Sequence, residues 1–220
     1  MANYKWHYAN YQHPALVAAF DMSSRTPGGL MKNLVQRTGA TFDATINGAL
    51  TLANPLIKCK KTKCMDLDGA TNWLALANPI SGLSSCTIVC WINMDVNGGI
   101  TWSRAGAAGN YVYIVSTFFR HASTLGFNDT RVIPVISRTY MVTTVLNAGI
   151  SSIYIDAKYS ERYSITPNIG PNAVDASAFI GQYFDASLKL NGRLDNMLFY
   201  NVALTPEQIW SIYRSANPRA

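Results

Sequence analysis

Apolar and polar residues alternate along this chain in many short runs, a period of two that is typical of half-buried β-strands. Turn-forming residues separate the runs, as at 27–29, 97–99 and 147–149. Many short strands with turn signals between them predict an all-β sandwich or barrel. The predicted strands are 15–21, 65–69, 73–76, 87–94, 100–103, 111–116, 131–136, 140–146, 152–156, 178–181 and 193–200, with outer strands between 41 and 52.

The clearest strand runs from Thr87 to Met94. Side chains two residues apart point to the same face of a strand, so Cys86 and Cys90 share a face with Ile88 and Ile92. We expect both cysteines to act there as small buried hydrophobic side chains.

One helix is predicted near the C-terminal end. Thr205 can cap the free N–H groups of its first turn, Pro206 suits the first helical position, and Gln208 completes a capping box. The apolar residues that follow repeat at helical spacing and share one face: Ile209, Ile212 and Tyr213. We therefore expect the helix to lie against the sandwich.

The 220 residues show neither an internal repeat nor a linker, a pattern that favours one domain. The first fourteen residues differ from the rest, so we divide the chain into an arm, 1–14, and a sandwich, 15–220. The arm crowds four aromatic residues into a segment without a clear period: Tyr4, Trp6, Tyr8 and Tyr11. Such a segment either packs on its own domain or docks on a neighbouring chain, and we favour docking.

The net charge is +6, and its densest cluster comprises Lys58, Lys60, Lys61 and Lys63. These lysines are either a solvated loop, the simpler interpretation, or a surface that docks on an anionic partner. No nucleic-acid-reading motif accompanies them, so nucleic-acid binding is not expected.

Four cysteines occur, in the spacings C-x4-C and C-x3-C. Cys59 and Cys64 flank a short loop and can close a disulfide in an oxidising setting. A four-cysteine zinc site is the alternative that the spacing leaves open, although histidine is scarce nearby. We expect no metal site.

Four segments resemble a known family. Residues 65–76 resemble its "L-x-F-D-G…Y-V-x-V" strand pair, 86–93 its "F-T-I-S-F-W-V-N" core strand, and 138–156 its "W-H-x-V…L-Y-V-D-G" hairpin. The most specific match is 191–209, which is similar to the closing "G-R-I-D-D-V-R-I-Y-N-R-A-L-S-x-E-E-I" of laminin-G-like jelly rolls. The resemblance covers about 15–215 and identifies the concanavalin A-like lectin/glucanase superfamily.

The resemblance implies two antiparallel sheets in a jelly-roll sandwich, completed here by the short C-terminal helix and the aromatic arm. Asp195 matches an acid whose role in the family is mostly structural, so we expect it to hold a turn. The fold implies little about function, because lectins, glycan hydrolases, adhesion modules and viral structural proteins all use it.

Catalysis is not expected. Glycosidases need paired carboxylates, and the laminarinase-type branch of this fold carries them as E-x-D-x-E, a string that this chain lacks. The only glutamates are Glu161 and Glu207. Of the three histidines, His7 and His13 lie in the arm, and His121 lies far from both in sequence. No triad or phosphate loop can be assigned.

No cofactor is expected, and calcium, which the family's lectins often bind, is the one alternative. The chain has ten Asp and two Glu, spread widely and without a D-x-D-x-D loop. The closest pair, Asp66 and Asp68, matches the family's turn motif instead.

We therefore expect a non-catalytic binding or assembly module, foremost a structural or surface protein of a bacteriophage virion that decorates a capsid or fibre. Its expected partners are other virion proteins or further copies of itself. The fold usually works outside cells, yet the chain shows neither a signal peptide nor a membrane-spanning segment. The expected location is a virion or a cell exterior.

The alternative is a carbohydrate-binding, lectin-like adhesion module. Sugar sites combine an aromatic platform with amide or acid groups that hydrogen-bond. The candidate residues are Asn72, Trp73, Trp102, Arg104, Gln182, Tyr183 and Asp185. Ordinary packing inside the sandwich is the competing interpretation of each.

Overall fold

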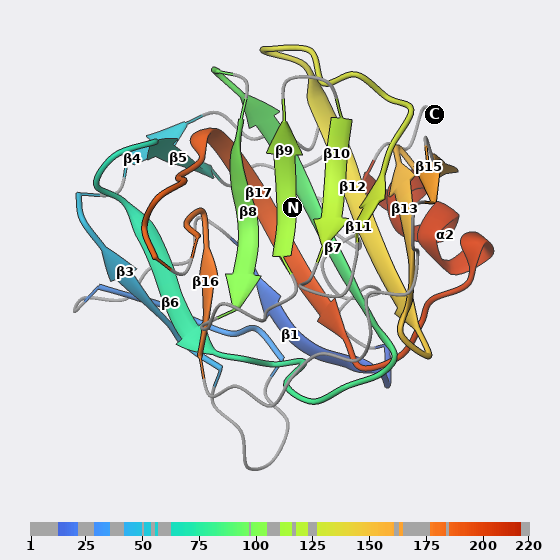
Figure 1. Ribbon diagram of the computed structural model, residues 1–220. Coiled ribbons are helices and arrows are strands. Elements are labelled where there is room, and N and C mark those ends of the chain that lie inside the picture. Colours follow the sequence, from blue (N-terminus) through green and yellow to red (C-terminus); the bar gives the residue numbers. More distant parts are fainter. Residues whose placement is uncertain are drawn as a thin grey trace, which may run out of the picture.

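The computed structural model describes residues 13–21, 29–35, 42–49, 51–53, 56, 63–96, 98–104, 111–115, 118–122, 127–160, 163–164, 177–183 and 185–216. In this part of the chain the strands form two antiparallel sheets that pack face to face, with a helix on the outside (Figure 1). This arrangement is the two-sheet jelly-roll sandwich that the sequence predicts.

The first sheet has its three longest strands side by side at its centre. In spatial order it contains β14 (Lys158–Tyr159), β13 (Ile150–Ile155), β12 (Thr139–Asn147), β7 (Cys86–Met94), β17 (Asn191–Tyr200), β5 (Cys64–Asp68) and β4 (Thr51–Ala53), and β1 (Leu16–Phe20) also pairs with β17. The three longest strands are β12, β7 and β17, and the pairing of β7 with β17 joins segments from the middle and the end of the chain.

The second sheet has a different edge-to-edge order. It contains β15 (Tyr163–Ser164), β11 (Phe127–Asp129), β10 (Phe118–Ala122), β9 (Tyr111–Val115), β8 (Gly99–Arg104), β16 (Ser177–Ile180), β6 (Trp73–Ala77), β3 (Ala44–Asn47) and β2 (Leu30–Met31). The late strand β16 thus lies between two strands from the first half of the sequence.

Strand β7 is buried over its whole length because both of its faces are covered. Cys86, Ile88, Cys90 and Ile92 face the core between the sheets, as predicted from their spacing. Burial raises the pKa of the Cys90 thiol to about 12, so the group stays protonated and acts as a small apolar side chain. On the opposite face, Trp91 lies in a separate apolar cluster under the helix.

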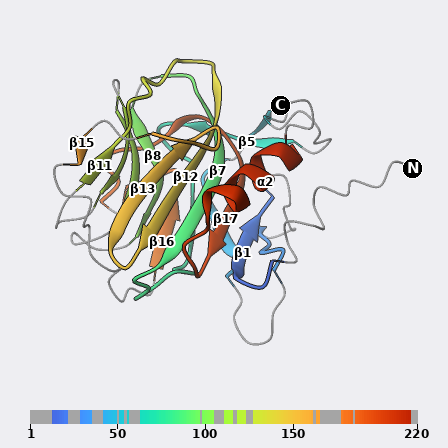
Figure 2. The same ribbon diagram turned by 90° about the vertical axis from the view of Figure 1, so that its right-hand side faces the viewer.

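Helix α2 (Pro206–Ala216) begins with the predicted capping box. The Thr205 backbone N–H donates to Gln208 Oε1 (2.8 Å), and the Gln208 N–H donates to Thr205 Oγ1 (3.4 Å). Ile209 and Ile212 are buried in the apolar cluster on the outer face of the first sheet. Figure 2 shows α2 in front of this face, beside the strand pair of β17 and β1. The predicted helix and its packing are confirmed.

Asp195 lies where β17 shifts its register against β7, between Asp195 and Met197. Its side chain is fully buried, and Oδ2 accepts a hydrogen bond from the Leu56 backbone N–H (3.0 Å). The carboxylate therefore ties the chain at Leu56 to a central strand, which is a structural role of the kind that the resemblance implies.

One predicted strand is absent: 131–136 pairs with no described strand and forms the connection between β11 and β12. Pro134 lacks the N–H that a ladder needs, which disfavours a strand interior. Nearby, Thr130 Oγ1 accepts a hydrogen bond from the Phe119 N–H (3.0 Å) and donates one to the Val132 carbonyl (3.1 Å). The expectation of a strand here was wrong.

The predicted arm falls mostly outside the described residues, including Tyr4, Trp6, Tyr8 and Tyr11. His13, near its end, packs edge-on against Tyr200, with ring centroids 5.4 Å apart, and its Nε2 lies 3.3 Å from Gln208 Nε2. The boundary between arm and sandwich stays a prediction.

Candidate functional site

The outer face of the second sheet carries two neighbouring aromatic rings. Trp73 lies at the start of β6 and Phe179 lies in β16, the strand beside it (Figure 1). The ring centroids are 5.4 Å apart, and the ring planes meet at 73°. Both side chains are half-buried, so part of each ring reaches solvent. A nearly perpendicular pair of this kind is a favourable aromatic geometry.

Uncharged side chains surround the two rings. Thr45 is paired with Ala75, and Asn47 is paired with Trp73, across β3 and β6. Ala75 pairs with Phe179, and Ser177 lies two residues earlier on the same side of β16. We call this set the aromatic face: Thr45, Asn47, Trp73, Ala75, Ser177 and Phe179. Thr45 and Ser177 are exposed, and the others are half-buried.

Alternation along each strand explains why these residues point outward. Leu74 and Leu76 of β6 belong to the core between the sheets, so Trp73 and Ala75 lie on the opposite side. In β16, Ala178 and Ile180 are in the core, which leaves Phe179 outside. The small Ala75 side chain is the cross-strand neighbour of Phe179 on this side of the sheet.

A hydrogen-bonded turn leads into Trp73. The Asp68 carboxylate accepts bonds from the backbone N–H groups of Ala70 and Thr71 (both 2.8 Å) and Asn72 (3.2 Å), and from the Thr71 hydroxyl. The Thr71 hydroxyl and then these amides hold the pKa of Asp68 well below its usual range, against the opposing effect of burial. The charged carboxylate thus fixes the chain just before the first ring.

Asn72 is buried inside that turn and does not reach the surface. Its Oδ1 accepts from the Asp68 N–H (2.9 Å), and its Nδ2 donates to the Ala49 carbonyl (3.4 Å). The expectation that Asn72 hydrogen-bonds a sugar is therefore corrected: its amide is engaged by the protein, and it positions Trp73.

The hairpin that follows β16 lies at the same end of the sheet. The Lys189 ammonium group donates to the Ala70 carbonyl, which brings the hairpin to the turn before Trp73. Tyr183 is half-buried, and Asp185 is exposed and accepts from the Ser187 N–H (2.9 Å). The Ser187 side chain and backbone both lower the pKa of Asp185. The structure thus brings the segments of Trp73 and Tyr183 together.

Gln182 belongs to the same hairpin but is buried. Its carbonyl accepts a hydrogen bond from the Ser103 hydroxyl (2.7 Å), and the residue forms an isolated bridge with Lys189. Its expected contact with sugar is corrected in the same way as that of Asn72, because the side chain has almost no exposed surface.

Trp102 and Arg104 are also buried, so they form no sugar platform. The Trp102 ring has no exposed surface and lies 6.2 Å from the Phe199 ring, centroid to centroid, within the core. The prediction was wrong because β8 is covered on both faces, which its local sequence does not reveal.

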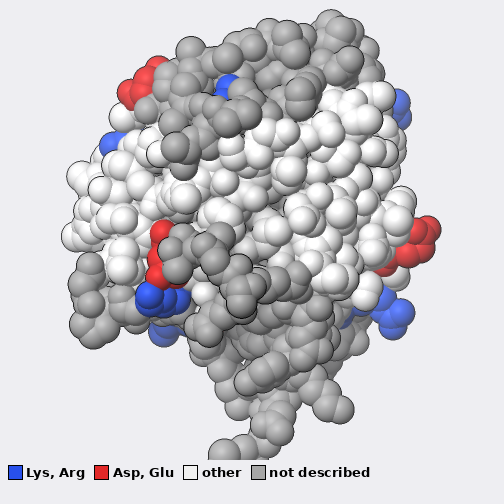
Figure 3. Space-filling view, turned by 90° about the horizontal axis from the view of Figure 1, so that it is seen from below, with Lys and Arg blue, Asp and Glu red and all other residues white. Residues whose placement is uncertain are grey.

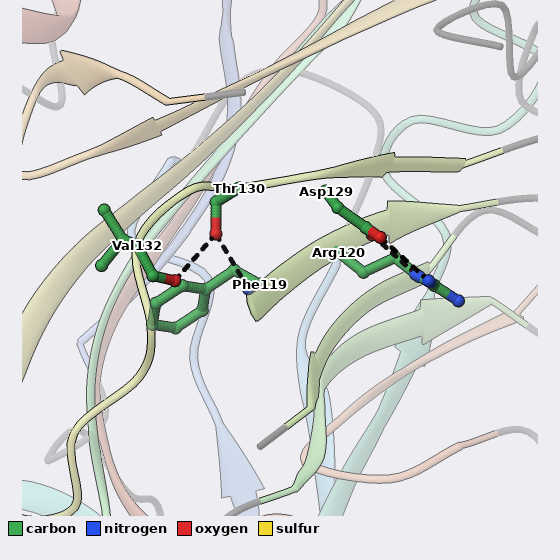
Figure 4. A network of polar contacts seen from close by, with 5 residues as sticks. All are labelled: Phe119, Arg120, Asp129, Thr130 and Val132. Carbon is green, nitrogen blue, oxygen red and sulfur yellow. Dashed lines mark hydrogen bonds and ion pairs between the residues drawn. The ribbon is translucent and has the colours of Figure 1, made fainter. Parts of the chain in front are cut away.

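A second aromatic cluster on the second sheet was not predicted. The Arg120 guanidinium carbon lies 4.8 Å from the Phe118 ring centroid and 4.0 Å from that of Phe127. Figure 4 shows Arg120 paired with Asp129, at 2.7 and 3.0 Å between nitrogen and oxygen atoms. The sequence signal was the spacing Phe-x-Arg and Phe-x-Asp on two consecutive runs. Its charges are satisfied internally, so this cluster stabilises the β10–β11 hairpin.

His121 lies 2.8 Å from the Ser151 hydroxyl, measured from Nδ1. This distance suits a general base and a nucleophile, but both residues are buried in the protein. Burial lowers the pKa of His121 to about 3, so the imidazole is neutral near pH 7. No sequence pattern links these two residues, because they lie on β10 and β13, which meet only in the folded chain.

Charge and metal ligands are sparse in the described part of the chain. Within it, no group of three or more His, Cys, Asp or Glu residues is placed to hold a metal ion. The described surface in Figure 3 is largely uncharged, with Lys, Arg, Asp and Glu near its margins. Lys63 is exposed, whereas Lys58, Lys60 and Lys61 lie outside the described residues. Cys59 also lies outside them, and Cys64 is buried, so the disulfide stays a prediction.

Comparison with known proteins agrees with this architecture. A family model described as the concanavalin A-like lectin/glucanases superfamily matches residues 68–210. A comparison with curated protein sequences finds no match.

Solved structures share the fold at low sequence identity. Domain 4 of AbnA, a GH43 extracellular arabinanase from Geobacillus stearothermophilus, in complex with arabinotriose, is 16% identical with a TM-score of 0.69. The match covers 90% of this chain and 98% of that one. The binding domain of botulinum neurotoxin DC in complex with SialylT is 13% identical with a TM-score of 0.66, over 92% of this chain and 52% of that one. This chain therefore spans about half of the neurotoxin domain.

Proposed function

Because the chain belongs to the concanavalin A-like lectin/glucanase superfamily, we propose that it is a lectin-like module that binds a neutral glycan on the aromatic face. The observation that carries the proposal is the half-exposed ring pair of Trp73 and Phe179. Aromatic rings offer apolar surface to the C–H groups of a sugar, while a few polar groups orient its hydroxyls.

The polar groups of the aromatic face suit a neutral ligand. Thr45 and Ser177 present exposed hydroxyls, and Asn47 presents a half-buried amide. None of these carries a charge, and Asp185 and Lys189 belong to the hairpin beyond the end of β16. Binding should therefore depend little on salt, because screening weakens interactions between charges.

Among the structural neighbours, domain 4 of AbnA in complex with arabinotriose supports the choice of a first probe. Arabinotriose is a short neutral oligosaccharide, which matches the uncharged character of the aromatic face. The botulinum neurotoxin DC binding domain in complex with SialylT provides an acidic contrast. The two ligands together distinguish a neutral from a charged preference.

The test is a glycan array that includes arabino-oligosaccharides and sialylated glycans, followed by calorimetry on any glycan that binds. Trp73→Ala should weaken binding by about tenfold or more, since loss of one well-packed aromatic contact removes roughly 1–3 kcal/mol. Trp210→Ala is the matched control, because Trp210 is exposed on α2, over the other sheet. No binding to any glycan, or equal losses in both variants, would contradict the proposal.

We further propose that the module is not catalytic. The buried His121–Ser151 pair lacks the solvent access that a substrate requires, which supports this view. Incubation of any bound oligosaccharide with the protein should leave it uncleaved. Cleavage that persists after repeated purification would refute this part of the proposal.

A virion role stays a prediction from the sequence. It depends on the aromatic arm and the lysine cluster, and Lys63 is the one proposed docking residue of these two segments that the structure describes. Labelling of native virus particles with an antibody against the chain would test the virion role, and absence of the label would contradict it.

A further inference from the structure

Four aliphatic side chains are exposed at one end of the sandwich. Ile133, Val135 and Ile136 expose 61, 52 and 45% of their surface, and Val96 exposes 45%. The first three belong to the connection between β11 and β12, at the top of Figure 1, and Val96 follows β7. We call these four residues the apolar tip. Exposed apolar clusters of this kind usually mark an interaction site.

Hydrogen bonds hold the two segments of the apolar tip together. The Ser137 N–H donates to the Met94 carbonyl, and Asn93 Nδ2 donates to the Ser137 carbonyl (both 2.8 Å). The connection between β11 and β12 therefore rests on the end of β7, two residues before Val96. The tip is one surface made from two neighbouring segments.

The outward orientation of the tip is fixed by its neighbours. Pro134 is buried, and Val132 packs against the core between the sheets, so the residues between and after them face outward. The Val135 N–H donates to the Tyr140 hydroxyl (2.9 Å), which anchors the backbone. The folded protein cannot bury the tip without breaking these contacts.

Cations flank the apolar segment on both sides. Arg131 and Arg138 are exposed, and no acidic residue occurs between them in the sequence. Arg138 lies over the Tyr140 ring, at 4.8 Å, and 3.6 Å from Asp156, so its charge is held near the base of the tip. Asp95, beside Val96, is offset by Arg193 at 3.4 Å. Among the described residues around the tip, the acids Asp95 and Asp156 are each paired with an arginine.

We propose that the apolar tip inserts into the surface of a lipid bilayer that contains anionic lipids, with Arg131 and Arg138 at the level of the headgroups. Aliphatic side chains insert at the boundary between the headgroups and the acyl chains of a bilayer, and cations bind the anionic headgroups above that boundary. The tip has the same arrangement, with aliphatic side chains flanked by two arginines. A protein partner would need a hollow of matching shape, and the tip lacks the Trp or Tyr anchor common at protein interfaces. No described helix is long and apolar enough to cross a membrane.

The test is co-sedimentation of the full chain with vesicles of phosphatidylcholine alone or mixed with phosphatidylglycerol. The mixed vesicles should bind the chain about tenfold more tightly, and the double variant Ile133→Ser/Ile136→Ser should lose about tenfold in affinity. Arg131→Gln/Arg138→Gln should reduce the preference for anionic vesicles. Ile150→Ser is the matched control and should bind normally, because Ile150 is 50% exposed on β13 and lies outside the tip.

Three results would overturn the proposal. The unmodified chain could fail to bind mixed vesicles, or the tip variant and the Ile150→Ser control could lose binding equally. The tip variant could also change the solution mass while vesicle binding is unaltered, which would make the tip a contact between copies of the chain. The vesicles carry no glycan, so each result is independent of the proposed glycan site.

Discussion

The two outer faces of the sandwich present aromatic rings in different ways. On the first sheet, Trp91 lies beneath α2 in an apolar cluster and is almost completely buried. On the second sheet, Trp73 and Phe179 are half-buried and part of each ring reaches solvent. The same strand geometry thus supplies both faces, and the cover provided by α2 decides which ring stabilises the fold and which is available to a ligand.

The largest expected change in the free energy of unfolding distinguishes Trp91 from Trp73. Trp91→Ala should lower the free energy of unfolding by about 3–5 kcal/mol, the usual cost of removing a fully buried large aromatic side chain. Trp73→Ala should cost about 1 kcal/mol, because it loses mainly one ring contact. Urea unfolding measures both, and equal losses would show that the two faces do not differ as described.

The stability of the protein should fall in acid because of a histidine that is buried in the interior. The pKa of His121 is about 3 in the folded protein because of burial, and 6.5 is its ordinary value. The unfolded chain therefore binds the proton first, and stability is full above pH 6.5 and falls as the pH drops toward 3. At pH 5 the loss should be about 2 kcal/mol relative to pH 8.

Unfolding measured across this pH range checks the prediction, with His121→Gln as the comparison. That variant should be less stable at pH 8 and should lose less stability between pH 8 and pH 5. Asp68 does not interfere, since its lowered pKa contributes stability that is lost only below its ordinary value of 3.8. Identical pH profiles for the two proteins would contradict the assignment to His121.

A smaller effect should follow from loosening the cover of the first sheet. Thr205→Ala removes the hydroxyl that accepts from the Gln208 N–H and should cost about 1 kcal/mol of stability. Thr205→Ser keeps the oxygen and should restore most of it. If both variants unfold alike in urea, the capping box does not contribute to holding α2 in place.

The smallest change in stability is expected on the open face. Asn47→Ala should alter the free energy of unfolding by less than about 0.5 kcal/mol, as most substitutions at the protein surface do. The substitution should instead weaken the binding of any glycan that the unmodified protein binds on the aromatic face, measured by calorimetry. Unchanged glycan affinity would remove Asn47 from the proposed site.

Sequence patterns predicted the elements better than the site. The period of two placed Cys86 and Cys90 in the core correctly, and the capping box placed the start of α2, because both depend on local geometry. Whether a strand shows its tryptophan to the core or to solvent depends on sheet pairing. Trp73 and Trp102 therefore looked alike in sequence, yet the second is fully buried.

Phe179 was missed for a related reason. Nothing near it in sequence marks it as a ligand platform, and its partner Trp73 lies far away along the chain. The run 131–136 led to the opposite error, since its β-branched apolar residues suggested a strand. Pro134 and the bonds of Thr130 made it a connection.

The position of β16 between β8 and β6 has a consequence for how the protein is made. A ribosome produces Trp73 well before the second ring of the aromatic face, which arrives only with β16. Any truncated product that stops earlier carries half of the proposed site. Pairings across such long sequence separations form slowly, and a ligand that requires both rings stabilises only the completed chain. An immobilised glycan would then retain correctly folded molecules that contain β16 and would not retain shorter products that lack it.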